Sequence, residues 1–225
     1  MDDSFSFAVQ DGLSVSGRLV VPPGARACYV LAHGAGAGMT HPFMESIAAS
    51  LSESNIATLR FQFPYRERGS GRPDPPALCQ ATVRAAVAEA TRMSGGLPLI
   101  AGGRSFGGRM SSQAQASAPL PGVIGLAFLG FPLHPAGKPS DERARHLFQT
   151  DVPMLFLQGD RDELATLALL KPLIERLGSR ATLKLIESAD HSYKVPARGG
   201  RKAAQVNAQL SLALHDWIES LIATS

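Results

Sequence analysis

The chain has 225 residues, of which 44% are hydrophobic, 18% charged and 6% aromatic, and its formal net charge is +3. This composition excludes a disordered chain and, because the 22 glycines and 16 prolines follow no repeat, a solenoid or collagen-like protein. The excess of positive charge is too small to indicate a nucleic-acid-binding tail. We therefore expect one globular domain over residues 1–225 with no nucleic-acid partner.

The N-terminal residues and the cysteines indicate where the protein works. The opening residues MDDSFSF are acidic and lack the apolar core of a secretion signal, and no apolar stretch reaches the ~18 residues that span a bilayer. Cys28 and Cys79 lie far apart without metal-ligand spacing, which is typical of reduced, buried thiols. The sequence thus predicts a cytoplasmic protein with no membrane partner.

The first half of the chain predicts a hairpin followed by alternating strands and helices. Asp11-Gly12 is a typical hairpin turn pair, and the apolar run at 27–32 is typical of a parallel strand buried on both faces. In chain order we expect a hairpin at 4–21, a strand at 27–32, a helix at 42–53, a strand at 57–63, a loop at 64–73 and a helix containing residues 83–90.

The second half continues the alternation of strands and helices. In chain order we expect a strand at 97–101, a helix through about 117, strands at 123–129 and 152–158, a helix near 164–178, a strand at 182–186 and a final helix containing residues 206–221. Residues 130–151 contain three prolines and a charged middle, so they predict a small flap and a minimal cap. Eight strands with interleaved helices predict a mostly parallel α/β sheet.

The most informative motif is Gly103-Arg104-Ser105-Phe106-Gly107, which matches G-x-S-x-G between a predicted strand and a predicted helix. Glycine is needed two residues before and after the serine, because a Cβ there would collide with neighbouring backbone. The turn presents Ser105 at a helix N-terminus, where N–H groups favour developing negative charge. The alternative for this motif alone is a glycine-rich turn with an ordinary helix-capping serine.

A serine nucleophile needs a base and an orienting acid, which we expect at strand ends in the order Ser, Asp/Glu, His. Asp162 follows the strand at 152–158, and His191 follows the last predicted strand. We predict Asp162 as the acid and His191 as the base, with Asp160 as the reserve acid. Asp190 adjoins His191 in sequence and is badly placed to hold its ring, which favours a solvated loop position.

The five other histidines do not follow the last strand. His33 ends a strand before a glycine-rich loop, which we expect it to brace. The rest lie in or near predicted helices or in the flap, where structural roles are more common: His41, His134, His146 and His215.

The loop Gly34–Gly38 predicts the second feature of an acyl-transfer site, backbone N–H groups for an oxyanion. We expect the donors to be the N–H groups of Phe106 and Ala35, with Gly36 as the alternative to Ala35. A dinucleotide site fits poorly, because Met39 stands where G-x-G-x-x-G needs its third glycine and no acid ends the next strand.

Six segments together resemble the small α/β-hydrolases related to dienelactone hydrolase: HGAGAGM, FPYRERG, GGRSFGGRM, GFPLHPAGKP, QGDRDEL and ADHSYKVP. The resemblance runs from about residue 27 to the C-terminus and is strongest to the branch with the testis-expressed and non-specific-lethal-complex subunit 3 type proteins. It implies an α/β-hydrolase fold with helices on both faces of the sheet, and the nucleophile, acid and base at Ser105, Asp162 and His191. Serine stands where dienelactone hydrolases usually have cysteine. Some eukaryotic relatives act in chromatin assemblies without established catalysis, so the resemblance also implies the alternative of a non-catalytic binding or scaffold module.

Basic residues gather in the loops that would border the site: Arg66, Arg68, Arg72, Arg104, Arg109 and Lys138. They would favour a carboxylate-bearing ester, and the alternative is solubility and internal salt bridges, for example with Glu67. Arg104 and Gly36 are expected to contact substrate. The sequence thus predicts a serine hydrolase that cleaves a small ester, thioester or lactone without a metal or organic cofactor, as a monomer or homodimer.

Overall fold

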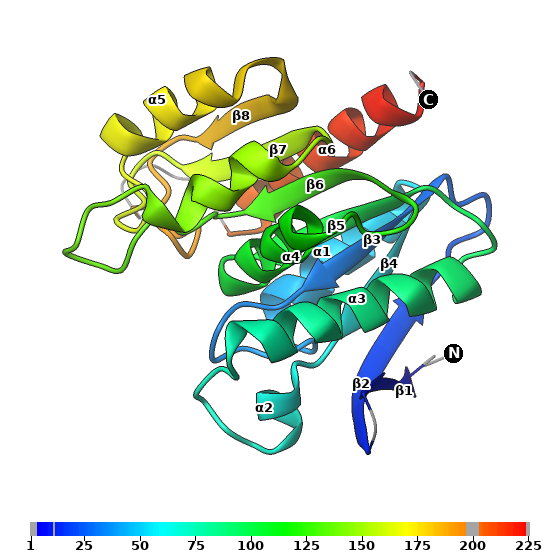
Figure 1. Cartoon of the computed structure of the whole chain (residues 1–225). Coiled ribbons are helices and arrows are strands. Elements are labelled where there is room, and N and C mark those ends of the chain that lie inside the picture. Colours follow the sequence, from blue (N-terminus) through cyan, green and yellow to red (C-terminus); the bar gives the residue numbers. More distant parts are fainter. Residues whose placement is uncertain (1–3, 11, 197–202, 224–225) are drawn as a thin grey trace.

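An eight-stranded sheet forms the centre of the protein in its computed structural model, which describes residues 4–10, 12–196 and 203–223. The strand order is β1-β2-β4-β3-β5-β6-β7-β8 (Figure 1). β2 pairs antiparallel with β1 and β4, and the other neighbours pair parallel. The predicted eight-stranded, mostly parallel α/β sheet is therefore confirmed.

The strands lie close to their predicted positions. Their bounds are β1 Ser4–Gln10, β2 Leu13–Val20, β3 Ala27–Ala32, β4 Ile56–Phe61, β5 Leu99–Arg104, β6 Val123–Leu129, β7 Met154–Gly159 and β8 Ala181–Ile186. The predicted hairpin is β1 and β2, although Asp11 of its turn lies outside the described residues. β5 runs three residues further than predicted because Arg104 still pairs with Leu129 of β6.

The helices differ from the prediction in the segments 64–67 and 142–149. Their bounds are α1 Pro42–Glu53, α2 Pro64–Glu67, α3 Pro76–Met93, α4 Phe106–Ser117, α5 Leu167–Leu177 and α6 Ala203–Ile222, with 3₁₀ turns η1 Glu142–Gln149 and η2 Gly178–Arg180. The short α2 replaces part of the predicted loop, because Pro64 at its first position already has a helical φ. The predicted flap contains η1. Among the described helices, none combines the length and the hydropathy that a membrane crossing requires.

The helices cover both faces of the sheet (Figure 1). α3, α4 and α5 pack on one face, and α1 and α6 pack on the other. The strands alternate accordingly: in β3, Val30 belongs to the core beneath α3 and α4, and Tyr29 and Leu31 belong to the core beneath α1 and α6. Burial on both faces explains why the central strands read as continuous apolar runs rather than as alternating ones.

The sheet topology determines where a site can form. β4 lies on one side of β3, and β5, the next strand in the sequence, lies on the other side. The loops that follow β3 and β5 therefore leave the sheet in opposite directions, and a crevice opens outside the carboxyl ends of these two strands. The residues that directly follow β3 and β5 are His33 and Ser105, at the start of the two predicted site segments.

Candidate active site

Ser105 lies at the sharp turn between β5 and α4. Its backbone has φ 47° and ψ −110°, a conformation that non-glycine residues rarely adopt and that structures retain mainly at functional sites. A Cβ on Gly103 would lie 2.1 Å from the carbonyl oxygen of Ala32, and one on Gly107 would lie 2.5 Å from the same oxygen. Both positions thus require glycine, as the motif predicts.

Ser105 and two residues from distant loops form a continuous chain of hydrogen bonds. Ser105 Oγ lies 2.8 Å from His191 Nε2, and His191 Nδ1 lies 2.6 Å from Asp162 Oδ2. A carboxylate can only accept, so in the neutral imidazole Nδ1 carries the proton and Nε2 offers its lone pair to the Ser105 hydroxyl. The structure therefore brings together the three residues that the sequence placed at separate strand ends.

The Asp162 carboxylate is buried and held by two further donors. The N–H of Leu164 donates to Oδ1 at 2.8 Å, and the side-chain amide of Gln158 donates to Oδ2. The amide oxygen of Gln158 in turn accepts from the N–H of Phe131 at 2.9 Å, so Gln158 links the ends of β6 and β7 to the acid. Sequence reasoning missed Gln158, because a buried polar residue inside an apolar strand was its only signal.

The two other aspartates near His191 have different surroundings. Asp160, the reserve acid, has one carboxylate oxygen buried without a hydrogen-bond partner in the described structure, and Asp162 occupies the position beside the ring. Asp190 accepts from the N–H groups of Ser192 at 2.8 Å and Lys194 at 2.9 Å. Asp190 therefore shapes the turn that carries His191.

The loop after β3 is braced by His33, as the sequence predicts. His33 is buried; its Nδ1 donates to the carbonyl of Gly34 at 2.8 Å, and its Nε2 accepts from the N–H of Phe63 at 3.2 Å. Burial lowers the pKa of His33 from 6.5 to about 4, so the ring is neutral at ordinary pH. This arrangement orients the glycine-rich loop beside the nucleophile.

A cavity of about 300 Å³ opens in front of Ser105. Its lining residues are Gly34, Ala35, Ala37, His41, Phe43, Met44, Arg104, Ser105, His191 and Ser192. Ala35 and Ser105 thus face the same space, whereas Gly36, with φ 74°, lies exposed at the tip of the loop. Sequence reasoning gave no site role to His41, Phe43, Met44 or Ser192. The reason is that α1 and the turn that carries His191 reach the cavity only through tertiary packing.

Phe106, the residue after Ser105, packs in a cluster of aromatic and basic side chains. Its ring packs edge-on against Phe63 and Tyr65, with ring centroids 5.4 and 6.5 Å apart. The guanidinium of Arg109 lies 5.8 Å from the centre of the Phe106 ring. Among the arginines of the 64–73 loop, Arg68 forms an ion pair with Asp74. Glu67, which the sequence suggested as a salt-bridge partner, accepts a hydrogen bond from the backbone N–H of Ser16.

A second serine–histidine pair lies deeper in the fold. Ser112 Oγ in α4 is 2.7 Å from His146 Nε2 in η1, and burial together with Arg109 lowers the pKa of His146 to about 4. His134 is buried in the 130–151 segment, and His215 is partly buried in α6. Within the described residues, no three His, Cys, Asp or Glu side chains converge as a metal site would require.

Known structures share this architecture. A dienelactone hydrolase from Anabaena variabilis is 21% identical, with a TM-score of 0.80 over 98% of this chain and 97% of its own. An esterase domain from a Rhodothermus marinus protein is 15% identical, with a TM-score of 0.73 over 96% of this chain and 97% of its own. An α/β serine hydrolase without a lid from Xanthomonas campestris is 20% identical, with a TM-score of 0.71 over 96% of this chain and 94% of its own.

The sequence itself matches one family profile. The profile is described as "Alpha/beta hydrolase domain" and matches residues 25–219, which include β3, the turn at Ser105, Asp162 and His191. The match covers most of the chain, and the eight-stranded sheet and the shared architecture agree with it. The chain therefore belongs to the alpha/beta hydrolase domain family.

Proposed function

We propose that this chain, as one domain over residues 1–225, is a serine hydrolase that cleaves small carboxylic esters, thioesters or lactones through an acyl-enzyme. Ser105 is the nucleophile, His191 the general base and Asp162 the orienting acid. The observation that carries the proposal is the unbroken hydrogen-bond chain from Ser105 through His191 to Asp162. A scaffold protein has no physical need for this chain at a strained turn that opens into a cavity.

The proposed reaction follows from the direction of these hydrogen bonds. As Ser105 Oγ attacks the substrate carbonyl, its proton passes to His191 Nε2, and the carboxylate of Asp162 stabilises the imidazolium that forms. His191 then gives the proton to the leaving alcohol or thiol. Water, deprotonated by the same nitrogen, hydrolyses the acyl-enzyme and regenerates Ser105.

Negative charge on the attacked carbonyl oxygen needs hydrogen-bond donors. The N–H of Phe106 belongs to the first turn of α4, where N–H groups have no partner within the helix. The N–H of Ala35 is the second donor that we propose, because Ala35 lines the cavity beside Ser105. Removing one such donor typically slows acyl transfer by about 10²- to 10³-fold.

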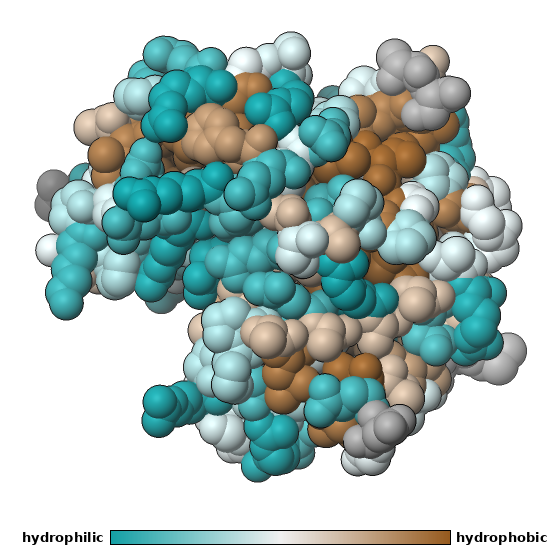
Figure 2. All heavy atoms as spheres, viewed as in Figure 1, coloured by the Kyte–Doolittle hydropathy of each residue, from teal (hydrophilic) through white to brown (hydrophobic). Residues whose placement is uncertain are grey.

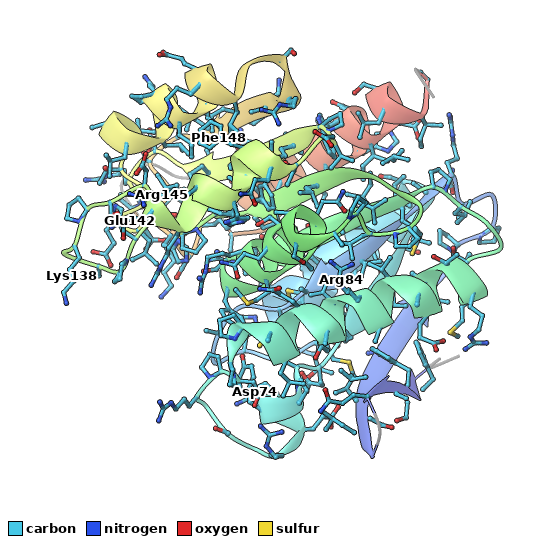
Figure 3. All side chains as sticks on the ribbon, in the orientation of Figure 1. Asp74, Arg84, Lys138, Glu142, Arg145 and Phe148 are labelled. Carbon is cyan, nitrogen blue, oxygen red and sulfur yellow. The ribbon has the colours of Figure 1, made fainter. Side chains whose placement is uncertain are left out.

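The size of the cavity and the charge of the 130–151 segment favour small or extended substrates. About 300 Å³ accommodates a short acyl chain rather than a long buried one. Figure 2 shows that hydrophilic residues gather on the 130–151 segment, beside an indentation in this face, and Lys138, Glu142 and Arg145 of this segment are labelled in Figure 3. A segment with so many charged side chains is poorly suited to cover a lipid chain, so we expect acetate and butyrate esters to be better substrates than palmitate esters.

We further propose that the chain belongs to the dienelactone-hydrolase-like group, in the branch with the testis-expressed and non-specific-lethal-complex subunit 3 type proteins. The six matching sequence segments support this placement. A cytoplasmic location, a monomeric or homodimeric state and independence from cofactors complete the proposal.

The test uses a fluorophosphonate probe, which reacts only with an activated serine. Purified wild-type protein should gain the mass of one adduct at Ser105 and hydrolyse p-nitrophenyl acetate and butyrate, and Ser105→Ala should do neither. Ser112→Ala is the matched control, because Ser112 also lies 2.7 Å from a histidine nitrogen but sits within α4. A folded wild-type protein that neither reacts nor turns over would instead indicate a binding module.

A further inference from the structure

Arg104, the residue between Gly103 and Ser105, has a guanidinium that is committed to main-chain carbonyls rather than free in the cavity. Nη1 donates to the carbonyl of Leu129 at 2.9 Å, and Nη2 donates to the carbonyl of His191. Leu129 ends β6, and His191 is the proposed base. One side chain therefore connects the nucleophile turn, the neighbouring strand and the turn that carries the base.

Two aromatic rings fix the guanidinium in this place. It lies 5.6 Å from the centre of the Phe43 ring and 5.2 Å from that of the Tyr193 ring, and these rings stack on each other with centroids 5.7 Å apart. The phenolic hydroxyl of Tyr193 donates to the carbonyl of Leu157 at 2.7 Å. The two rings restrict the orientation of the guanidinium, and the hydrogen bond to Leu157 of β7 restricts the Tyr193 ring.

The backbone around Arg104 leaves room for this arrangement. A Cβ on Gly130 would lie 2.6 Å from Arg104 Nη1 and 3.6 Å from His191 Cε1. Any larger residue at position 130 would therefore displace the guanidinium, whereas its contact with the imidazole would be an ordinary van der Waals one.

The main-chain hydrogen bonds within the turn that carries His191 are made by the residues on either side of His191. The carbonyl of Asp190 accepts from the N–H of Tyr193 at 3.0 Å, and the N–H of Asp190 donates to the carbonyl of Lys194 at 3.0 Å. These bonds close the turn, but they do not attach it to the sheet at His191. The bond from Arg104 to the His191 carbonyl supplies that attachment directly at the residue whose ring must meet Ser105.

We propose that Arg104 is a positioning residue, which holds the main chain of His191 so that its imidazole stays in register with Ser105. This inference rests on the proposed function. The motif G-x-S-x-G then has a second role in this chain, because its first variable residue positions the base while its serine is the nucleophile. Displacement of a catalytic group by about 1 Å can slow a reaction by about 100-fold, so such a restraint affects the rate strongly.

The surroundings of Arg104 argue against a primary role in binding a substrate carboxylate. Both terminal nitrogens of the guanidinium already donate to main-chain carbonyls, and the charges of Asp162 and Asp190 favour its protonated form. Burial lowers the pKa of Arg104, and these two carboxylates oppose that shift. The guanidinium thus has partners within the protein for both of its terminal nitrogens.

Steady-state kinetics of two esters separates positioning from binding. The neutral ester is p-nitrophenyl acetate, and the anionic one is the mono-p-nitrophenyl ester of succinic acid. For Arg104→Met we expect kcat to fall about 10- to 100-fold on both esters, with KM changed by less than about 3-fold. Arg104→Lys should not restore kcat, because an ammonium cannot span both carbonyls as the planar guanidinium does.

Arg84→Met is the matched control. Arg84, labelled in Figure 3, also donates to main-chain carbonyls, those of Ala114 and Ala118, but at the far end of α4 from Ser105. We expect its kcat to equal that of the wild type. A KM that rises only for the anionic ester, with kcat retained in Arg104→Met, would overturn the inference in favour of substrate binding, and so would unchanged kinetics.

A measurement without turnover distinguishes failure of this inference from failure of the proposed function. The His191 Nδ1 proton bonded to Asp162 should give a downfield ¹H NMR signal, which Asp162→Asn identifies by removing it. In Arg104→Met and Arg104→Lys we expect this signal to broaden or disappear through solvent exchange, and in Arg84→Met to persist. If the wild-type protein hydrolyses nothing, this signal still decides the inference, and a sharp, unshifted signal in both Arg104 variants refutes it. Should Arg104→Met fail to fold by circular dichroism, Arg104→Lys alone gives the answer.

Discussion

Two serine–histidine pairs in this protein have almost the same separation and very different surroundings. Ser105 Oγ lies 2.8 Å from His191 Nε2, and Ser112 Oγ lies 2.7 Å from His146 Nε2. The first pair bridges the β5–α4 turn and the loop after β8, whereas the second bridges the middle of α4 and the 3₁₀ turn η1. A short distance between these groups therefore does not by itself indicate a nucleophile.

The two pairs differ in the direction of the proton between the serine and the histidine. Asp162 accepts from Nδ1 of His191, which leaves Nε2 as an acceptor for the Ser105 hydroxyl. Ser112 also contacts the carbonyl of Arg109 at 3.0 Å, and a carbonyl can only accept, so both contacts are satisfied when Ser112 donates to the carbonyl and His146 Nε2–H donates to Ser112. The third group thus decides whether the serine gives or receives the proton.

The largest expected difference between the pairs is in turnover. We expect His191→Ala to lower kcat/KM for p-nitrophenyl acetate by about 10⁴- to 10⁶-fold, because the base is lost. His146→Ala should retain kcat/KM within about 3-fold, since His146 is not part of the proposed relay. A comparable loss of activity in both variants, with both folded by circular dichroism, would mean that the two pairs do not differ as we infer.

The next prediction concerns the acid that distinguishes the pairs. Asp162→Asn should lower kcat by about 10⁴-fold, because the amide would favour the wrong tautomer of His191. Asp160→Asn is the matched control, since Asp160 lies two residues away outside the relay and should keep wild-type turnover. The measurement is kcat with p-nitrophenyl acetate, and equal losses in the two variants would contradict the assignment of the acid.

A smaller effect is expected on stability, through the backbone beside each serine. Gly107, two residues after Ser105, has no space for a side chain, whereas Ala114, two residues after Ser112, already carries a buried Cβ. Gly107→Ala should lower the free energy of unfolding in urea by about 3 kcal/mol, because the new Cβ meets backbone atoms that cannot move easily. Ala114→Gly should lose only about 1 kcal/mol, and a Gly107→Ala variant as stable as the wild type would refute the close packing of the turn.

The smallest expected effect is a pH dependence of stability at His146. Its pKa in the folded protein is about 4, below the ordinary 6.5, so as the pH falls from 6.5 towards 4 the unfolded chain gains a proton that the folded one does not. Stability is therefore lost over this window and is retained above it. Urea unfolding at pH 7 and pH 5 should show a loss about 2 kcal/mol larger in the wild type than in His146→Gln. His33, with a similarly lowered pKa, contributes equally to both proteins, and an equal pH dependence in the two would contradict this role of His146.

Much of the fold and the outline of the site could be predicted from the sequence for local physical reasons. The strands 27–32 and 123–129 are continuous apolar runs, and the structure has both with the same bounds. Gly103 and Gly107 indicate a turn that has no space for side chains, and each glycine gives this information by itself, without knowledge of its distant neighbours. By contrast, α2 was missed, since four residues give too few periods to distinguish a helix from a loop.

The roles of Gln158, Arg104 and Phe43 could not be predicted in the same way. Each acts through a partner that is distant in sequence: Gln158 on Phe131, Arg104 on Leu129 and His191, and Phe43 on Tyr193. A single sequence does not show which distant residues lie close together in space. An arginine beside a nucleophile is equally consistent with a group that binds a substrate anion and with a group that positions the base.

The sequence by itself determined the order of strands and helices, the strained turn at Ser105 and the strand ends from which an acid and a base emerge. These features depend on hydropathy periods and on glycine sterics, which are properties of neighbouring residues. Only the tertiary structure decided which aspartate accepts a hydrogen bond from His191 and in which serine–histidine pair the histidine nitrogen accepts from the serine. It also decided which carbonyls the guanidinium of Arg104 bonds. Those outcomes depend on how the strands pack and in which register they pair, because the residues that meet are as far apart in the chain as Arg104 and His191, which are separated by 87 positions. A shift of one residue in the register would direct the same side chains elsewhere.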